Sequence, residues 1–112
     1  MDAIYDIDVE SLLSIYGEKY THEIKLLTQI IESCLSEDSI RNNNENKEML
    51  ISSLKRRIII NCTIEKYQNV LDDIEIFKKF NGEFNKELVL AWIEARMALV
   101  LKSAINPVRQ KF

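Results

Sequence analysis

The residues best able to do chemistry in this chain are few and widely spaced. Cys34 and Cys62 are its two cysteines, and His22 is its single histidine. A structural zinc ion needs about four such ligands, and the two cysteines lack the CxxC spacing that commonly supplies a pair of them. We therefore expect no zinc site and predict no cofactor. Isolated thiols of this kind are typical of buried, uncharged side chains in a reducing compartment, without a structural disulfide.

Acidic side chains gather at Asp72, Asp73 and Glu75, which the sequence places on the polar side of a helix. A paired-carboxylate catalytic site also needs a pocket and a converging partner group, and no motif supplies them. Gly17 and Gly82 stand alone, so a glycine-rich phosphate-binding loop is excluded. The sequence thus predicts a protein that is not an enzyme and has no evident small-molecule substrate.

Lys55, Arg56 and Arg57 form the densest basic cluster. On a helix, three consecutive side chains spread over about 200°, so they cannot all contact one line of phosphates. The net charge of −3, from 15 basic and 18 acidic residues, gives no sustained positive field. A solvated helix face is therefore the favoured interpretation of this cluster, and nucleic-acid contact is the less favoured alternative.

The composition predicts an all-α protein. The 112 residues fit a single domain, 1–112, and 46% of them are hydrophobic. Two glycines and one proline fall far below the average usage of about 7% and 5%, which leaves little material for tight β-turns. The acidic start, Met1 to Asp6, lacks the features of a signal peptide. We expect a cytoplasmic location, or a nuclear one in a eukaryotic host.

Apolar periodicity predicts a bundle of about four helices, at residues 8–17, 21–36, 47–80 and 85–106. The Asn-rich segment 36–46 is predicted to be a mobile loop, because asparagine side chains compete with helix formation by bonding to nearby backbone groups.

Local signals set the expected helix ends. Gly17 is the predicted stop of the first helix, and Thr21 is the predicted N-cap of the second. Asn81-Gly82 is the predicted C-terminal cap of the third helix, and Asn85 the N-cap of the fourth.

The third helix is predicted to be long, because no glycine or proline lies between Asn46 and Asn81. Its apolar stripe alternates spacings of four and three, at Ile60, Ile64, Tyr67, Leu71 and Ile74. The β-branched run Ile58-Ile59-Ile60 is its weak point. A kink or break near Asn61 is the alternative.

The segment from Leu88 to Leu101 is apolar almost all round, interrupted only by Glu94 and Arg96. It is too short and too charged to span a membrane, which takes about 20 apolar residues. Either it is a central core helix, or part of its surface meets another protein chain. We favour the second interpretation, with a predicted protein interface formed by Leu88, Val89, Trp92, Arg96, Leu99 and Leu101.

Two of these interface residues have a simpler alternative. Trp92 is the predicted anchor, because large aromatic side chains dominate many interfaces, but an ordinary core tryptophan is equally expected. Arg96 is a candidate for an ion pair between subunits, and a solvated arginine is the alternative.

One arrangement resembles a known family. A capped helix at Thr21-His22-Glu23-Ile24, a loop, and then the run from Leu50 to Arg57 leading to Tyr67 is similar to the helical domain of GINS subunits, which accompany the replicative helicase. The similarity covers roughly residues 20–80. It implies a chain that docks by long helices into a hetero-oligomer at DNA replication. GINS subunits usually also carry a small β-rich domain, and the composition of this sequence predicts none.

The sequence leaves two functions open. The favoured one is a helical protein–protein interaction module that serves as a subunit of a multi-protein complex, homo- or hetero-oligomeric. The alternative is a small regulatory protein of a phage, virus or plasmid that binds and inhibits a host protein. The small size, the acidic charge and a composition rich in isoleucine and asparagine are compatible with this alternative.

Overall fold

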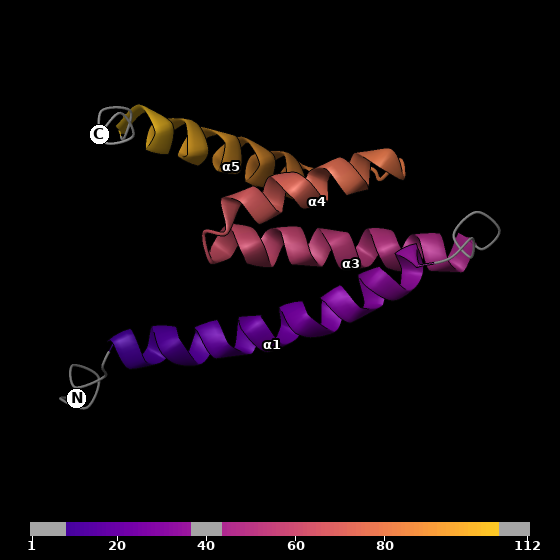
Figure 1. Cartoon of the computed structure of the whole chain (residues 1–112), viewed down its shortest axis with the longest axis horizontal. Helices are drawn as coiled ribbons and strands as arrows, with labels where there is room; N and C mark the ends of the chain where they lie inside the picture. Colours follow the sequence, from indigo (N-terminus) through magenta and orange to yellow (C-terminus); the bar gives the residue numbers. More distant parts are fainter. Residues whose placement is uncertain (1–8, 37–43, 106–112) are drawn as a thin grey trace.

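The computed structural model describes residues 9–36 and 44–105, with side chains described over 17–36 and 44–103. The elements are α1 (Val9–Leu35), α3 (Asn44–Thr63), α4 (Tyr67–Lys79) and α5 (Lys86–Ile105). Figure 1 shows these helices along the chain. The predicted all-α class with four helices is confirmed for the described residues.

Helix α3 lies at the centre of the bundle. Helix α1 packs against one side of α3, and α4 packs against the other (Figure 1). Helix α5 contacts both α3 and α4, whereas over the described residues α1 makes its helix-to-helix contact with α3 alone.

Buried side chains from all four helices form one core. From α3, Leu50, Leu54 and Ile58 point inward at a spacing of four residues, which places them on one face. The other helices add Ile31 and Cys34, then Val70, Ile74 and Phe77, and finally Leu88, Ala91 and Ala95. Two of the residues that α5 contributes are alanines, and their small side chains allow its backbone to lie near α3 and α4.

The predicted helix at 47–80 is wrong, because the chain breaks between α3 and α4. Glu65 adopts a left-handed conformation, with φ of 63°. The amide of Glu65 donates to the Cys62 carbonyl at 3.2 Å, and the amide of Lys66 donates to the Asn61 carbonyl at 2.7 Å. These bonds form a Schellman motif, which ordinarily uses glycine at the left-handed position.

Packing explains why the chain turns where no glycine or proline marks a stop. A left-handed backbone strains a non-glycine residue by roughly 1 kcal/mol. The turn lets α4 fold back on α3, which buries Val70, Ile74 and Phe77 completely. Burial of each such side chain contributes about 1.5–3 kcal/mol, so tertiary packing outweighs the local strain. The break follows Thr63, close to the alternative position at Asn61.

The two predicted helices at 8–17 and 21–36 are instead one helix, α1. Thr21 does not cap a new helix; its hydroxyl donates to the Gly17 carbonyl at 2.8 Å within the continuous helix. A single glycine inside a helix costs only about 1 kcal/mol. The helical residues on both sides of Gly17 offset the free-energy cost of this glycine, so Gly17 does not end the helix.

The predicted cap at the end of α4 is confirmed. Asn81 is left-handed, with φ of 59°, and its amide donates to the Lys78 carbonyl at 3.0 Å. The amide of Gly82 donates to the Phe77 carbonyl at 2.9 Å. This is a second Schellman motif, and here asparagine occupies the left-handed position, which it tolerates well.

The predicted start of α5 is also confirmed, because the Asn85 side chain accepts a hydrogen bond from the Leu88 amide at 2.8 Å. At the other end of the Asn-rich segment, α3 begins at Asn44, so 44–46 are helical and not part of the predicted loop at 36–46. Ser36 directly follows the last residue of α1, and the rest of that predicted loop, residues 37–43, lies outside the described residues.

Candidate protein interface

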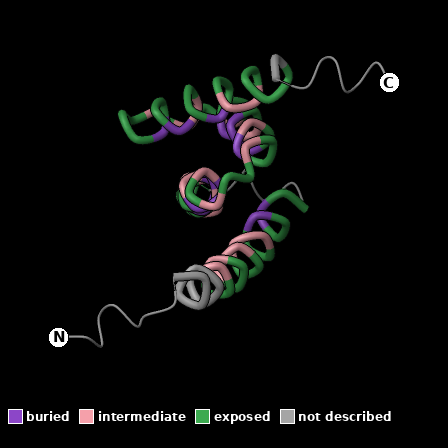
Figure 2. The backbone as a smooth tube through the Cα atoms, turned by 90° about the vertical axis from the view of Figure 1, so that its left-hand side faces the viewer, coloured by how far each residue is buried: buried purple, intermediate pink, exposed green. Residues whose placement is uncertain are grey.

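Helix α5 is apolar on two opposite sides. One side faces the core through Leu88, Ala91 and Ala95, which are at most 5% exposed. The opposite side, here called the outer face, consists of Val89, Leu90, Ile93, Met97, Val100 and Leu101. These six side chains are between 38% and 67% exposed. Figure 2 shows the exposed side of α5 turned away from the other helices.

The outer face is continuous. At about 100° per residue, its side chains cover an arc of about 120° and a length of about 18 Å along the helix. No charged residue falls within this arc between Val89 and Leu101. The exposed apolar area is on the order of 500 Å², which is within the range of the largest patches on typical monomers, ~300–600 Å², and such patches are often functional.

The structure places three of the six predicted interface residues toward the interior. Leu88 is 1% exposed and belongs to the core, so its predicted place in the interface is wrong. Leu99 is half-buried. Trp92 is also half-buried and packs against the core, with its ring stacked on Phe84 at a centroid distance of 5.5 Å and the Lys78 ammonium 5.1 Å from the ring centroid.

The other predicted residues lie on or beside the outer face. Val89 and Leu101 belong to it and are 38% and 57% exposed. Arg96 is exposed at its edge, and within the described part of the chain no hydrogen bond or ion pair involves it.

The prediction omitted four members of the outer face, namely Leu90, Ile93, Met97 and Val100. A helical wheel shows that they share one side, but it does not say which side faces the bundle. The small side chains Ala91 and Ala95 were the available signal, since close helix packing favours small residues at the contact.

The basic cluster divides between two different environments. Arg57 is only 15% exposed, and its guanidinium donates two hydrogen bonds to the Asp73 carboxylate, at 2.7 Å and 2.6 Å. A third donation reaches the Thr28 hydroxyl at 3.0 Å. Arg57 therefore connects α1, α3 and α4 from inside the bundle, where it serves packing and not an external phosphate.

Arg56 points to the surface and forms a two-pronged ion pair with Glu23 of α1. Its second hydrogen bond measures 3.1 Å. The hydrogen bond from Arg56 is the main cause of the lowered pKa of Glu23, and the same pair raises the pKa of Arg56. Two of the three cations proposed for nucleic-acid contact are thus engaged by carboxylates of the chain itself.

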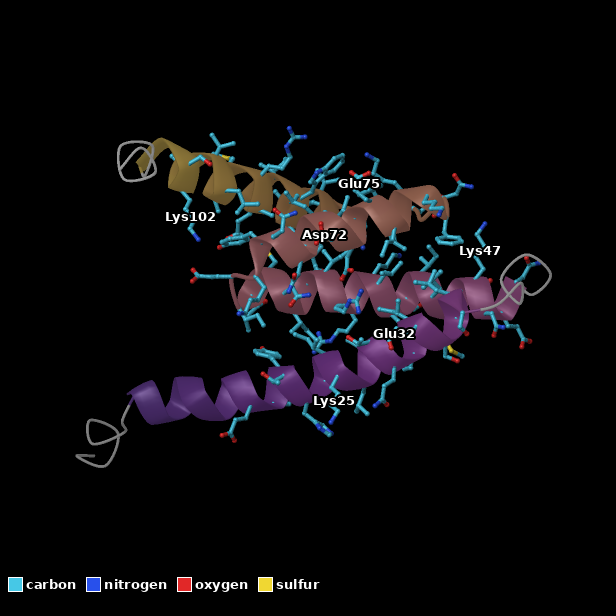
Figure 3. The ribbon with its side chains drawn as sticks, in the orientation of Figure 1. Lys25, Glu32, Lys47, Asp72, Glu75 and Lys102 are labelled. Atoms are coloured by element: carbon cyan, nitrogen blue, oxygen red, sulfur yellow. The ribbon has the colours of Figure 1, made fainter. Side chains whose placement is uncertain are left out.

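The acidic residues do not converge on one point. Asp73 is buried against Arg57, whereas Asp72 is exposed and accepts a hydrogen bond from Gln68 at 3.0 Å. Both line a groove of about 360 Å³ between α1, α3 and α4. Figure 3 shows the labelled charges spread over different helices. Over 9–36 and 44–105, no group of three or more His, Cys, Asp or Glu side chains is arranged to hold a metal ion.

Cys62 is a nucleophilic side chain that contacts a charged neighbour. Its thiol donates to Glu94 Oε2 at 2.9 Å. Partial burial, then the hydrogen bond to Glu94 and the negative charge of that carboxylate, raise the pKa of Cys62 from its ordinary value near 9 to about 12. Cys62 and the buried Cys34 are both free thiols.

We expect the Cys62 thiol to react slowly with an aromatic disulfide reagent at pH 8, because only the thiolate attacks. In a Cys34→Ala background, the rate should be at least 100-fold below that of the unfolded chain and should rise about tenfold per pH unit up to pH 11. Glu94→Gln should increase the rate while leaving part of the protection, which comes from burial. A rate that levels off near pH 9 would contradict the raised pKa.

The same pKa difference affects stability at high pH. Between pH 9 and about 12 the unfolded chain loses a proton that folded Cys62 retains. The free energy of unfolding therefore falls as pH rises through that window.

None of the helices, over the residues described, is long and apolar enough to cross a membrane. Comparisons with protein-family models, with curated proteins and with solved structures give no match. None of these comparisons tests the resemblance to GINS subunits.

Proposed function

We propose that this chain is a non-enzymatic helical interaction module that serves as a subunit of a multi-protein complex and binds a protein partner through the outer face of α5. The observation that carries the proposal is the continuous apolar arc from Val89 to Leu101, with exposed fractions up to 67%. Removing such an area from water is favourable by about 25 cal/mol per Å², so a partner that covers it gains binding free energy.

The polar chemistry of the chain supports the same function. Arg57 pairs with Asp73, Arg56 pairs with Glu23, and Cys62 donates to Glu94. These groups are used to hold helices together. The sequence similarity to GINS subunits suggests a replication complex as the setting. The free thiols fit a reducing compartment, which supports a cytoplasmic or nuclear location as part of the proposal.

Site-specific photo-crosslinking in the source cells tests the proposal. A photoreactive phenylalanine analogue is placed at Met97, in the middle of the outer face, and in a matched variant at Lys25, which is exposed on α1. We expect a discrete adduct from position 97 and none from position 25. No adduct at position 97, or equal adducts at both positions, would refute a docking role for the outer face.

A further inference from the structure

The two edges of the outer face carry opposite charges. Glu87 and Glu94 are seven residues apart, so they lie along the same edge. Arg96 lies along the other edge, about 160° from Glu94 around the helix, with the apolar side chains between them. The Cys62 thiol holds Glu94 in place through its hydrogen bond at 2.9 Å.

The apolar side chains also have a heptad spacing. Leu90, Ile93, Met97 and Val100 follow one another at intervals of three, four and three residues. This is the spacing with which one helix packs along another, and the charged residues beside it select the partner. The outer face is therefore shaped for a helix, and its edges specify which charges that helix carries.

We infer that the occupant is an amphipathic helix of a different protein, with basic side chains along the Glu87–Glu94 edge and acidic side chains along the Arg96 edge. This inference rests on the proposed function and adds the chemistry of the partner. The simplest other occupant is a second copy of this chain.

An antiparallel second copy matches the charges badly. In the register that overlaps the whole outer face, identical edges meet, so Glu94 lies opposite Glu94 of the second copy. On the other edge Arg96 lies opposite Arg96 of the second copy. Like charges placed together at an interface oppose association and act against the wrong partner.

A parallel second copy also leaves the charges without partners. In a parallel pair, an edge residue meets the residue five positions further along the other helix. Arg96 would then lie against Leu101 of the second copy, and Val89 against its Glu94. Each charge would lose water without gaining an ion pair, which is unfavourable. A foreign helix with one basic and one acidic edge pairs both Glu94 and Arg96.

Two synthetic helical peptides test this assignment by direct binding to the full chain. Both have three heptads with the same apolar stripe. One has a lysine edge and a glutamate edge, and the other has lysine on both edges. Each is used below the concentration at which it self-associates. Wild type should bind the mixed-edge peptide at least tenfold more tightly. Arg96→Glu, which makes both edges acidic, should reverse the preference.

The control for folding is the helical circular dichroism of the Arg96→Glu variant, which should equal that of wild type because Arg96 is exposed. Equal affinity for the two peptides, or no binding of either, overturns the charge assignment. Sedimentation of the chain alone at twice its mass of 13.1 kDa assigns the face to a second copy and also overturns it. An adduct at Met97 in cells would still support the proposed function in each of these cases.

Discussion

Replacing Arg57 by methionine should lower the free energy of unfolding by about 3–5 kcal/mol. Methionine preserves most of the volume of the side chain but removes all three hydrogen bonds that Arg57 donates to Asp73 and Thr28. The Asp73 side chain, only 6% exposed, would then be a buried carboxylate without its counter-charge. Urea unfolding followed by circular dichroism measures the loss.

Arg56→Met is the matched control, since it removes a neighbouring arginine whose side chain is 51% exposed. Exposed ion pairs contribute up to about 1 kcal/mol, so this variant should lose far less stability than Arg57→Met. The double variant Arg57→Met with Asp73→Leu should recover most of the stability, because it removes both buried charges together. If Arg56→Met and Arg57→Met lose equal stability, Arg57 does not have the structural role assigned to it.

Replacing Phe77 by alanine should also lower the free energy of unfolding by about 3–5 kcal/mol. Phe77 is 0% exposed, and its ring meets Phe84 edge to face at a centroid distance of 5.1 Å. The ring also covers Gly82, where a Cβ atom would lie 2.4 to 2.6 Å from three ring carbons. Alanine at position 77 would leave a cavity under the turn that leads into α5. Thermal and urea unfolding both report the loss.

A double-mutant cycle separates this packing from a general loss of core volume. Gly82→Ala alone should lose about 1–3 kcal/mol, because the Phe77 ring must move to admit the new methyl group. In the Phe77→Ala background the obstruction is absent, so Gly82→Ala should lower the free energy of unfolding much less. Additive effects of the two substitutions would show that the ring and the glycine do not constrain each other.

Helix ends that depend on local side-chain chemistry were predictable. The carboxamide of Asn85 caps α5 using groups within three residues, and Asn81-Gly82 ends α4 with residues suited to the turn. The break at Glu65 was not predictable in this way. Glutamate has no preference for a left-handed backbone, and the turn is favoured only once α4 packs on α3.

The candidate site shows the same division between local and tertiary information. Composition alone indicated that α5 is too apolar to be covered by one small bundle. It did not indicate that Ala91 and Ala95 face the core while Met97 and Val100 face outward, because that choice depends on how α5 packs against α3 and α4. The burial of Arg57 was missed for a related reason, since its partner Asp73 belongs to a different helix.

The attachment of α1 to a single neighbouring helix affects the hydrogen exchange of its amides. Among the described residues, α1 packs against α3. A link toward α4 runs through Arg57 of α3, which donates hydrogen bonds both to Thr28 of α1 and to Asp73 of α4. Helices α3, α4 and α5, in contrast, contact one another mutually. Amide hydrogens of α1 should therefore exchange with solvent through a partial opening that leaves the other three helices folded. Each such opening uncovers the side of α3 on which Ile31 and Cys34 pack, so it adds a transiently exposed apolar surface to the outer face of α5.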